Sequence, residues 1–209
     1  MVVVKLKPFN EILKTLNGYR KVTLMGCELG SGRCMQGGLK EAKEVAQFLE
    51  NNGKEIVEVL TLGGTCIVER VRKLKFKNTD IIVSLACGAG TQVLSEETEI
   101  PVVTGVSTLF IGSDSHREVF KEYCIACGDC IISTTGSICP VARCPKSLKY
   151  GPCGGAIGGM CEVNNDVECI WFTIERKLKK INKELHLFKD IEFTDFSISN
   201  HPRRFENEI

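Results

Sequence analysis

The chain has little histidine, no long apolar run and almost no net charge. Only three of its 209 residues are histidine, and 27 Lys and Arg residues nearly balance 26 Asp and Glu residues, which gives a formal net charge of +1. This balance provides no electrostatic reason to bind nucleic acid or an anionic membrane surface. No stretch approaches the roughly 18 apolar residues of a membrane span, and the start has too short an apolar run for an export signal. We therefore expect a cytoplasmic protein that binds no nucleic acid and spans no membrane.

Motifs for nucleotide binding and for nucleophilic catalysis are also missing. The glycine-rich loop from Gly26 to Gly38 could hold a phosphate at a helix N-terminus, and Glu58 could serve as a ribose-binding acid. The G-x-G-x-x-G spacing fails at Met35, however, and no G-x4-G-K-[ST] run exists. No histidine lies near a cysteine motif, so a Cys–His nucleophile pair is not expected. We predict no catalytic residue, and an electron carrier or subunit is favoured over a complete enzyme.

Cysteine, in contrast, is abundant: there are twelve, and eight fall between residues 124 and 169. The eight are Cys124, Cys127, Cys130, Cys139, Cys144, Cys153, Cys161 and Cys169. Clustered C-x2-C spacing in a reducing compartment favours metal ligands over disulfides or redox-active thiols. Eight thiolates suffice for two four-ligand metal sites.

The first three cysteines have the spacing C-x2-C-x2-C, which suits a [4Fe–4S] cluster. Zinc also takes four thiolates, and the wider spacings of the later cysteines fit either metal. We predict one to three [4Fe–4S] clusters, with zinc as an alternative in one site, and leave the pairing of cysteines open. Positive charge at Arg143 and Lys146, with nearby glycine amides, would raise the potentials of the clusters.

Residues 20–112 alternate apolar runs with amphipathic stretches. The apolar runs predict four buried parallel strands, and the 3.6-residue periodicity of the intervening segments predicts helices. The expected strands are 21–26, 55–60, 80–86 and 101–105, and the expected helices are 38–51 and 67–75. This βαβ order predicts an α/β fold with a flavodoxin-like parallel sheet.

Four more cysteines follow these strands: Cys27, Cys34, Cys66 and Cys87. Open α/β sheets bind their ligands at the carboxyl ends of the strands, so these thiols are candidates for a third metal site. The alternative is that Cys66 and Cys87 are small buried hydrophobic residues, as free cysteines often are.

The chain is predicted to have three parts. Residues 1–117 form the α/β domain, residues 118–190 form a cysteine-rich metal-binding module that ends in a long helix, and residues 191–209 form a tail. The helix carries apolar residues at alternating steps of three and four: Trp171, Ile174, Leu178, Ile181, Leu185 and Phe188. That seam packs on the chain's own core or binds a partner, and the tail needs a partner or a groove to be ordered.

The cysteine motifs, taken with their neighbours, resemble a known family. The segments are Cys124-Ile-Ala-Cys-Gly-Asp-Cys130, Cys139-Pro-Val-Ala-Arg-Cys-Pro-Lys146, Gly151-Pro-Cys-Gly-Gly155 and Gly159-Met-Cys-Glu-Val163. They are similar to the methylenetetrahydrofolate reductase C-terminal domain family, which includes the small, MetV-type subunit of that reductase. The first half resembles the same family through Cys27, Cys34, Cys66 and Cys87, although Gly30 stands where many relatives have a further cysteine.

The resemblance implies an iron–sulfur electron-transfer subunit. Such a subunit partners a flavin-containing catalytic subunit that reduces methylenetetrahydrofolate in the Wood–Ljungdahl pathway of one-carbon metabolism. The upstream electron donor is not indicated. Two alternatives stay open: a structural zinc-binding assembly module, and a relative that serves corrinoid methyl transfer.

Overall fold

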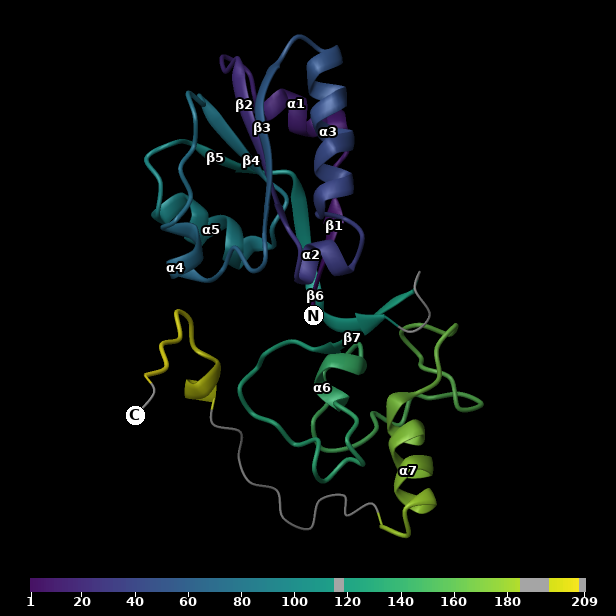
Figure 1. Ribbon diagram of the computed structural model, residues 1–209. Coiled ribbons are helices and arrows are strands. Elements are labelled where there is room, and N and C mark those ends of the chain that lie inside the picture. Colours follow the sequence, from purple (N-terminus) through teal and green to yellow (C-terminus); the bar gives the residue numbers. More distant parts are fainter. Residues whose placement is uncertain (115–118, 185–195, 207–209) are drawn as a thin grey trace. The chain divides into compact units, whose positions relative to one another are not determined.

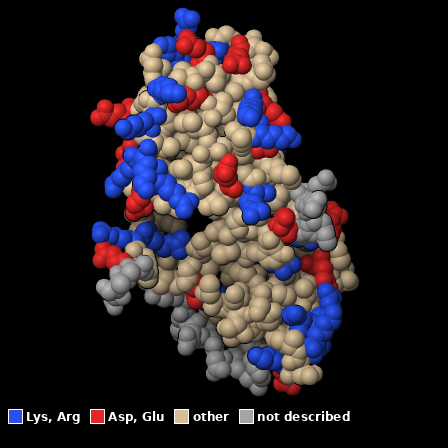
Figure 2. Space-filling model, viewed as in Figure 1, with Lys and Arg blue, Asp and Glu red and all other residues tan. Residues whose placement is uncertain are grey.

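The computed structural model describes residues 1–114, 119–184 and 196–206 and divides into two compact units, Met1–Lys121 and Glu122–Ile209 (Figure 1). No helix within the described residues is long and apolar enough to cross a membrane. Basic and acidic side chains are interspersed over the visible face of the first unit (Figure 2). This face thus reflects the near balance of charge in the sequence.

A four-stranded parallel sheet forms the centre of the first unit. Its strands are β2 (Lys21–Cys27), β3 (Glu55–Leu62), β4 (Ile81–Ser84) and β5 (Val102–Thr104), in the spatial order β3-β2-β4-β5. Counted along the chain, the order of these parallel strands is 2-1-3-4, the order in which flavodoxin-like sheets begin. The predicted parallel sheet is therefore confirmed, and each predicted strand matches to within two residues.

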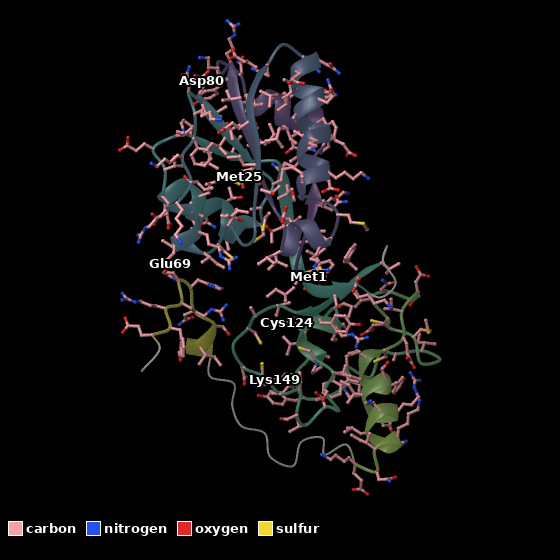
Figure 3. All side chains as sticks on the ribbon, in the orientation of Figure 1. Met1, Met25, Glu69, Asp80, Cys124 and Lys149 are labelled. Atoms are coloured by element: carbon pink, nitrogen blue, oxygen red, sulfur yellow. The ribbon has the colours of Figure 1, made fainter. Side chains whose placement is uncertain are left out.

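The two faces of this sheet are buried in separate apolar clusters. In β2, Val22 and Leu24 belong to the larger cluster, whereas Met25 belongs to the smaller one (Figure 3). All three side chains are fully buried. Burial on both faces explains why the strands are continuously apolar in sequence instead of alternating.

Helices cover both faces of the sheet. They are α1 (Phe9–Thr15), α2 (Gly30–Arg33), α3 (Leu39–Asn51), α4 (Val68–Val71) and α5 (Gly88–Glu96). Residues of α1 and α3 pack in the larger cluster, and residues of α4 and α5 pack in the smaller one. The unit therefore has three layers, as the βαβ pattern predicts.

One of the two predicted helices agrees with the structure, and the other was predicted too long. α3 begins where expected, and the backbone N–H of Gly38 donates a 2.8 Å hydrogen bond to the Glu41 carboxylate in its first turn, which satisfies a donor of the helix start. The helix predicted for residues 67–75 is wrong in extent, because α4 is a single turn. Leu74 and Phe76 still reach the smaller cluster from non-helical backbone, so their burial does not require a helix.

A second sheet, absent from the sequence-based prediction, joins distant parts of the chain. It contains β1 (Val2–Leu6), β6 (Val106–Asp114) and β7 (Phe120–Cys124) in the order β1-β6-β7. β1 and β6 are antiparallel, and Val2 is paired with Ile111. The short apolar run at the start of the chain is therefore an edge strand whose partner lies more than a hundred residues away.

The second unit has little regular structure. Its elements are the one-turn helix α6 (Pro140–Arg143), the helix α7 (Ile170–Lys180) and the 3-10 helix η1 (Phe196–Ser199). The core of this unit is a small cluster centred on α7, with Trp171, Ile174 and Leu178 among its buried members. Three described members of the predicted apolar seam therefore pack on the chain's own core.

The prediction of a long C-terminal helix is wrong for the described residues, because α7 ends at Lys180. Asn182 adopts a left-handed conformation with φ 53°. The Lys183 N–H donates to the Leu178 carbonyl at 3.0 Å, and the Asn182 N–H donates to the Lys179 carbonyl at 3.2 Å. These two bonds form a Schellman motif, which stops a helix by satisfying its last carbonyls.

Two further positions of the predicted seam, Leu185 and Phe188, lie outside the described residues. Ile181 lies just beyond the end of α7 and is exposed.

Candidate metal centre

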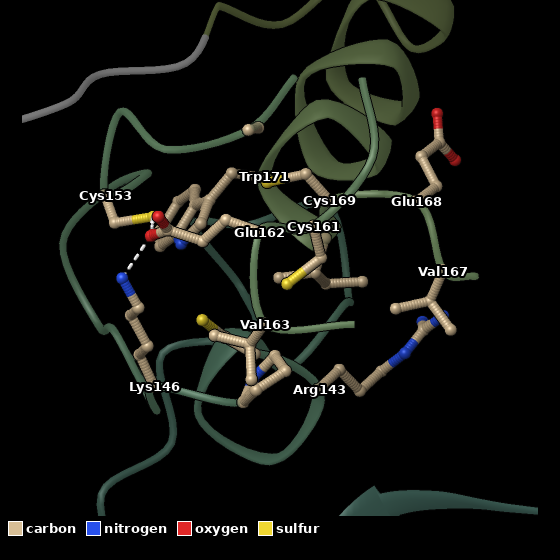
Figure 4. A pocket seen from close by; sticks show the side chains of 14 residues that line it. Arg143, Lys146, Cys153, Cys161, Glu162, Val163, Val167, Glu168, Cys169 and Trp171 are labelled. Atoms are coloured by element: carbon tan, nitrogen blue, oxygen red, sulfur yellow. Dashed lines mark hydrogen bonds and ion pairs between the residues drawn. The ribbon is translucent and has the colours of Figure 1, made fainter. Parts of the chain in front are cut away.

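Four cysteines of the second unit line one pocket. They are Cys144, Cys153, Cys161 and Cys169 (Figure 4). Much of the remaining wall is apolar, and Val163 lies among the labelled side chains that form it. These four belong to the eight predicted ligands, whose sequence spacing does not reveal which of them lie together. We call this cavity the four-thiol pocket.

Two of these thiols are positioned by backbone hydrogen bonds just before α7. The Cys161 N–H donates to the Val167 carbonyl at 2.9 Å, and the Cys169 N–H donates to the Gly159 carbonyl at 2.8 Å. Cys169 is also the N-cap of α7 and is buried. This folded-back segment therefore brings two cysteines, eight residues apart in sequence, to the same wall.

The helix α6 separates two other cysteines. Cys139 is its N-cap and accepts a 3.4 Å hydrogen bond from the Ala142 N–H, whereas Cys144 is its C-cap and lines the pocket. Arg143 lines the pocket too, and its guanidinium carbon lies 5.6 Å from the centroid of the Tyr123 ring. Cys139 is not among the pocket-lining residues, so one turn of helix places neighbouring Cys-Pro motifs in different surroundings.

Cys153 takes part in a polar cluster at the pocket. Its thiol donates a 3.0 Å hydrogen bond to Glu162 Oε1, and the same oxygen is paired with the ammonium of Lys146 (Figure 4). The hydrogen bond from Lys146, followed by that from Cys153, lowers the pKa of the Glu162 carboxyl. A Cβ at Gly155 would lie 2.1 Å from the carboxyl group, so a larger residue there would displace the Glu162 side chain. The positive charge of Lys146, expected to act on a cluster, is thus paired with a carboxylate.

Trp171 contributes a buried polar atom to the same pocket. The residue is 3% exposed, lines the pocket, and its indole Nε1 has no hydrogen-bond partner among the described residues. Buried N–H groups are almost always hydrogen-bonded. The pocket therefore combines four thiols, whose soft sulfur atoms can act as metal ligands, with one N–H group that donates no hydrogen bond to the described residues.

The thiols are not arranged as a preformed metal site. Across residues 1–114, 119–184 and 196–206, no group of three or more His, Cys, Asp and Glu side chains could hold a metal ion. The chemistry of the donor set nevertheless fits a thiophilic metal, since four thiols share one largely apolar wall and soft thiolates select iron–sulfur clusters or zinc. The predicted ligand sets stay predictions.

The three leading cysteines form a tight loop after β7, the triple-cysteine loop (residues 124–130), with Cys124 at its start (Figure 3). Ala126 and Gly128 adopt left-handed conformations, with φ 54° and 91°. The Ala126 N–H donates a 3.2 Å hydrogen bond to the sulfur of Cys124. Backbone N–H groups directed at sulfur are common where thiolates hold a metal cluster. Cys130 is exposed.

The last described segment of the chain contacts this loop. The Ser199 hydroxyl donates a 2.9 Å hydrogen bond to the Cys127 carbonyl. A Cβ at Gly128 would lie 3.2 Å from the Ile198 carbonyl oxygen and 3.3 Å from the guanidinium of Arg203. The predicted tail is therefore packed, in its described part, on the cysteine-rich unit.

The four cysteines of the first unit lie in the loops that follow the parallel strands. Cys27 ends β2, Cys34 caps α2, Cys66 follows β3, and Cys87 is the N-cap of α5. Cys27 and Cys34 are buried, Cys87 is half-buried and Cys66 is exposed. In the described part of this unit they form no group that could hold a metal.

The two buried thiols have opposite electrostatic surroundings. The Cys34 thiol donates to the carbonyls of Ser31 (3.3 Å) and Val4 (3.6 Å), and burial raises its pKa. Burial also acts to raise the pKa of Cys27, but hydrogen bonds from Thr65, Leu29 and a neighbouring glycine outweigh it and lower the pKa. Cys34 therefore behaves as a core residue, whereas Cys27 is disposed to form a thiolate.

Sequence reasoning missed two features of the four-thiol pocket. Trp171 was treated only as an apolar residue of a helix seam, although it is the single tryptophan of the chain and lies two residues after Cys169. The ion pair of Lys146 with Glu162 spans 16 residues, and no periodicity in the sequence indicates it.

These observations define a class: a two-unit α/β protein whose second unit is a cysteine-rich module built around a thiol-lined pocket. Residues 103–197 match the family model described as Methylene-tetrahydrofolate reductase C terminal, so this part of the chain is similar to that family. The resemblance of the cysteine motifs is thereby confirmed for the second half of the chain. No curated protein and no solved structure gives a significant match.

Proposed function

We propose that this chain is the iron–sulfur electron-transfer subunit of a methylenetetrahydrofolate reductase, which passes electrons to a flavin-containing catalytic partner in one-carbon metabolism. The family match over residues 103–197 supports a place in that reductase system. The observation that carries the electron-transfer role is the four-thiol pocket, which is lined by four cysteines and by an indole whose N–H has no partner among the described residues.

The structure suggests how the eight cysteines of the second unit divide between two sites. The pocket site would use Cys144, Cys153, Cys161 and Cys169. The other site would use Cys124, Cys127, Cys130 and Cys139. Iron–sulfur clusters, when bound, accept and release single electrons. The protein's part is to hold them by thiolates, to direct backbone N–H groups at sulfur, as Ala126 and Ala142 do, and to exclude water from the pocket by apolar walls.

Metal analysis of two serine variants tests this division. The chain is purified anaerobically, and iron, acid-labile sulfide and zinc are measured per polypeptide, with EPR after reduction. Cys153→Ser should remove the metal of the pocket site and keep that of the triple-cysteine loop, while Cys130→Ser should do the reverse. Each variant is the control for the other. Equal loss of all metal in both variants would refute the division into two sites.

Delivery of electrons to the partner tests the assigned role. Reduced chain is mixed with the flavin-containing catalytic subunit of a methylenetetrahydrofolate reductase, and flavin reduction is followed by its absorbance. Rapid flavin reduction supports the proposal. Failure with the flavoprotein, together with reduction of a corrinoid protein, would assign the chain to corrinoid methyl transfer instead.

A structural zinc module is the second candidate, and one observation favours it. The buried core of the second unit is small, with five buried residues in its cluster, and small modules of this kind often depend on metal for folding. Colourless protein with stoichiometric zinc and no sulfide would support this reading. Brown, redox-active protein containing iron and sulfide would refute it.

A further inference from the structure

The indole N–H of Trp171 is the most conspicuous unused group in the second unit. The residue is only 3% exposed, and Nε1 has no acceptor among the described residues. Trp171 also lines the four-thiol pocket, as do Cys153 and Glu162 (Figure 4). A buried donor that lacks a partner is costly and calls for an explanation, such as an unfilled ligand position.

Both carboxylates in the pocket wall already accept hydrogen bonds. Glu162 binds Lys146 and the Cys153 thiol. Glu168 accepts hydrogen bonds from the Arg176 guanidinium and the Thr173 hydroxyl. Besides the second oxygen of Glu162, the remaining side-chain acceptors of the wall are sulfur atoms, which accept hydrogen bonds well only as thiolates or as sulfides of a cluster.

The indole is also held firmly enough to aim a hydrogen bond. Trp171 lies in the first turn of α7, two residues after the N-cap Cys169. It packs in the same buried cluster as Ile174 and Leu178, which are 0% and 2% exposed. The helix therefore fixes the ring relative to a thiol of the pocket.

We infer that Trp171 Nε1–H donates a hydrogen bond to a sulfur, either of a thiolate ligand or of the group that these thiolates hold in the four-thiol pocket. The inference rests on the proposed function, because it presupposes that the pocket takes up a metal. Trp171 would be a positioning residue. Its N–H would stabilise the more negative, reduced state and so raise the reduction potential of an iron–sulfur site.

Replacing the single tryptophan by an analogue in which sulfur takes the place of the ring N–H tests this directly. Because the chain contains one Trp, the analogue changes one group in the whole protein. We expect about a tenfold change in the reduction equilibrium of the pocket site, a fall of about 59 mV for one electron. Trp171→Phe should lower the potential likewise. Phe172→Leu, at a neighbouring side chain that is 38% exposed, should not.

A second measurement needs no variant. In 15N-labelled chain the single indole N–H gives one cross-peak, and loading with Zn²⁺ should move that peak downfield as a thiolate accepts a hydrogen bond from this N–H. An unmoved peak, or an unchanged potential in the analogue with full iron and sulfide content, would overturn the inference and leave the proposed function standing. Absence of iron and sulfide from the unaltered chain would instead refute the proposed function, and the zinc-loaded cross-peak would still decide the role of Trp171.

Discussion

The small core of the second unit predicts that Ile174→Ala destabilises this unit strongly. Ile174 is fully buried in the cluster around α7. The substitution removes three carbon atoms, which at about 0.8 kcal/mol per buried CH₂ amounts to about 2.4 kcal/mol of lost transfer free energy. The cavity left behind adds to this, so we expect a loss of about 3–4 kcal/mol in the free energy of unfolding. Ile174 also packs in the same cluster as Trp171, so metal retention in the pocket should fall as well.

Tryptophan fluorescence during denaturant unfolding measures this loss, because the single tryptophan lies in the second unit and reports on that unit alone. Ile181→Ala is the matched control. It deletes the same atoms at a residue that is 44% exposed just beyond the end of α7, and we expect it to cost less than about 1 kcal/mol. If the two variants lost equal stability, burial of Ile174 in this core would not be what stabilises the unit.

Two further substitutions test other contacts. A Cβ at Gly37 would lie 2.1 Å from the carbonyl oxygen of Leu85, so Gly37→Ala should lower the free energy of unfolding of the first unit by about 2–3 kcal/mol, as measured by circular dichroism during unfolding. The control is Gly63→Ala, whose Cβ would lie 3.4 Å from its nearest neighbour and which should be tolerated. Equal losses of stability in the two variants would contradict the argument. Hydrogen bonds, chiefly from Arg176, lower the pKa of Glu168 to about 2 from its usual 4.5, so the stabilisation is complete above about pH 4.5 and is lost as the pH falls towards about 2. Glu168→Gln should therefore lower stability at pH 7 and flatten the dependence of the unfolding free energy on pH across that window, and an unchanged slope would show that the ion pair does not contribute.

The elements predicted well are those whose signal is local. The run from Lys21 to Gly26 is apolar because β2 is buried on both faces, and this appears directly in the residues. Helix α3 shows its buried face as a 3.6-residue repeat, and Glu41 marks its start. The βαβ order then leads to a parallel sheet with little ambiguity.

The elements predicted poorly depend on distant or single-residue effects. The pairing of β1 with β6 joins Val2 to Ile111, and nothing in either segment specifies the other. The end of α7 depends on one residue, Asn182, which takes a left-handed conformation. The apolar repeat continues past that point in sequence, so periodicity alone extends the helix too far.

The features of the candidate site likewise fall into those that local sequence predicts and those that depend on distant contacts. The sequence by itself determined that the chain is rich in clustered thiols, that a parallel α/β sheet precedes them and that their motifs resemble those of one family, because composition, periodicity and short spacings are local properties. Only the tertiary structure decided that Cys144 and Cys169 share a pocket, that Lys146 is paired with Glu162 and that the Trp171 N–H finds no acceptor in the described part of the chain. The physical reason is that, apart from Trp171 in α7, these residues lie in loops or at helix ends, and their positions are set by backbone hydrogen bonds and packing between segments separated in the sequence.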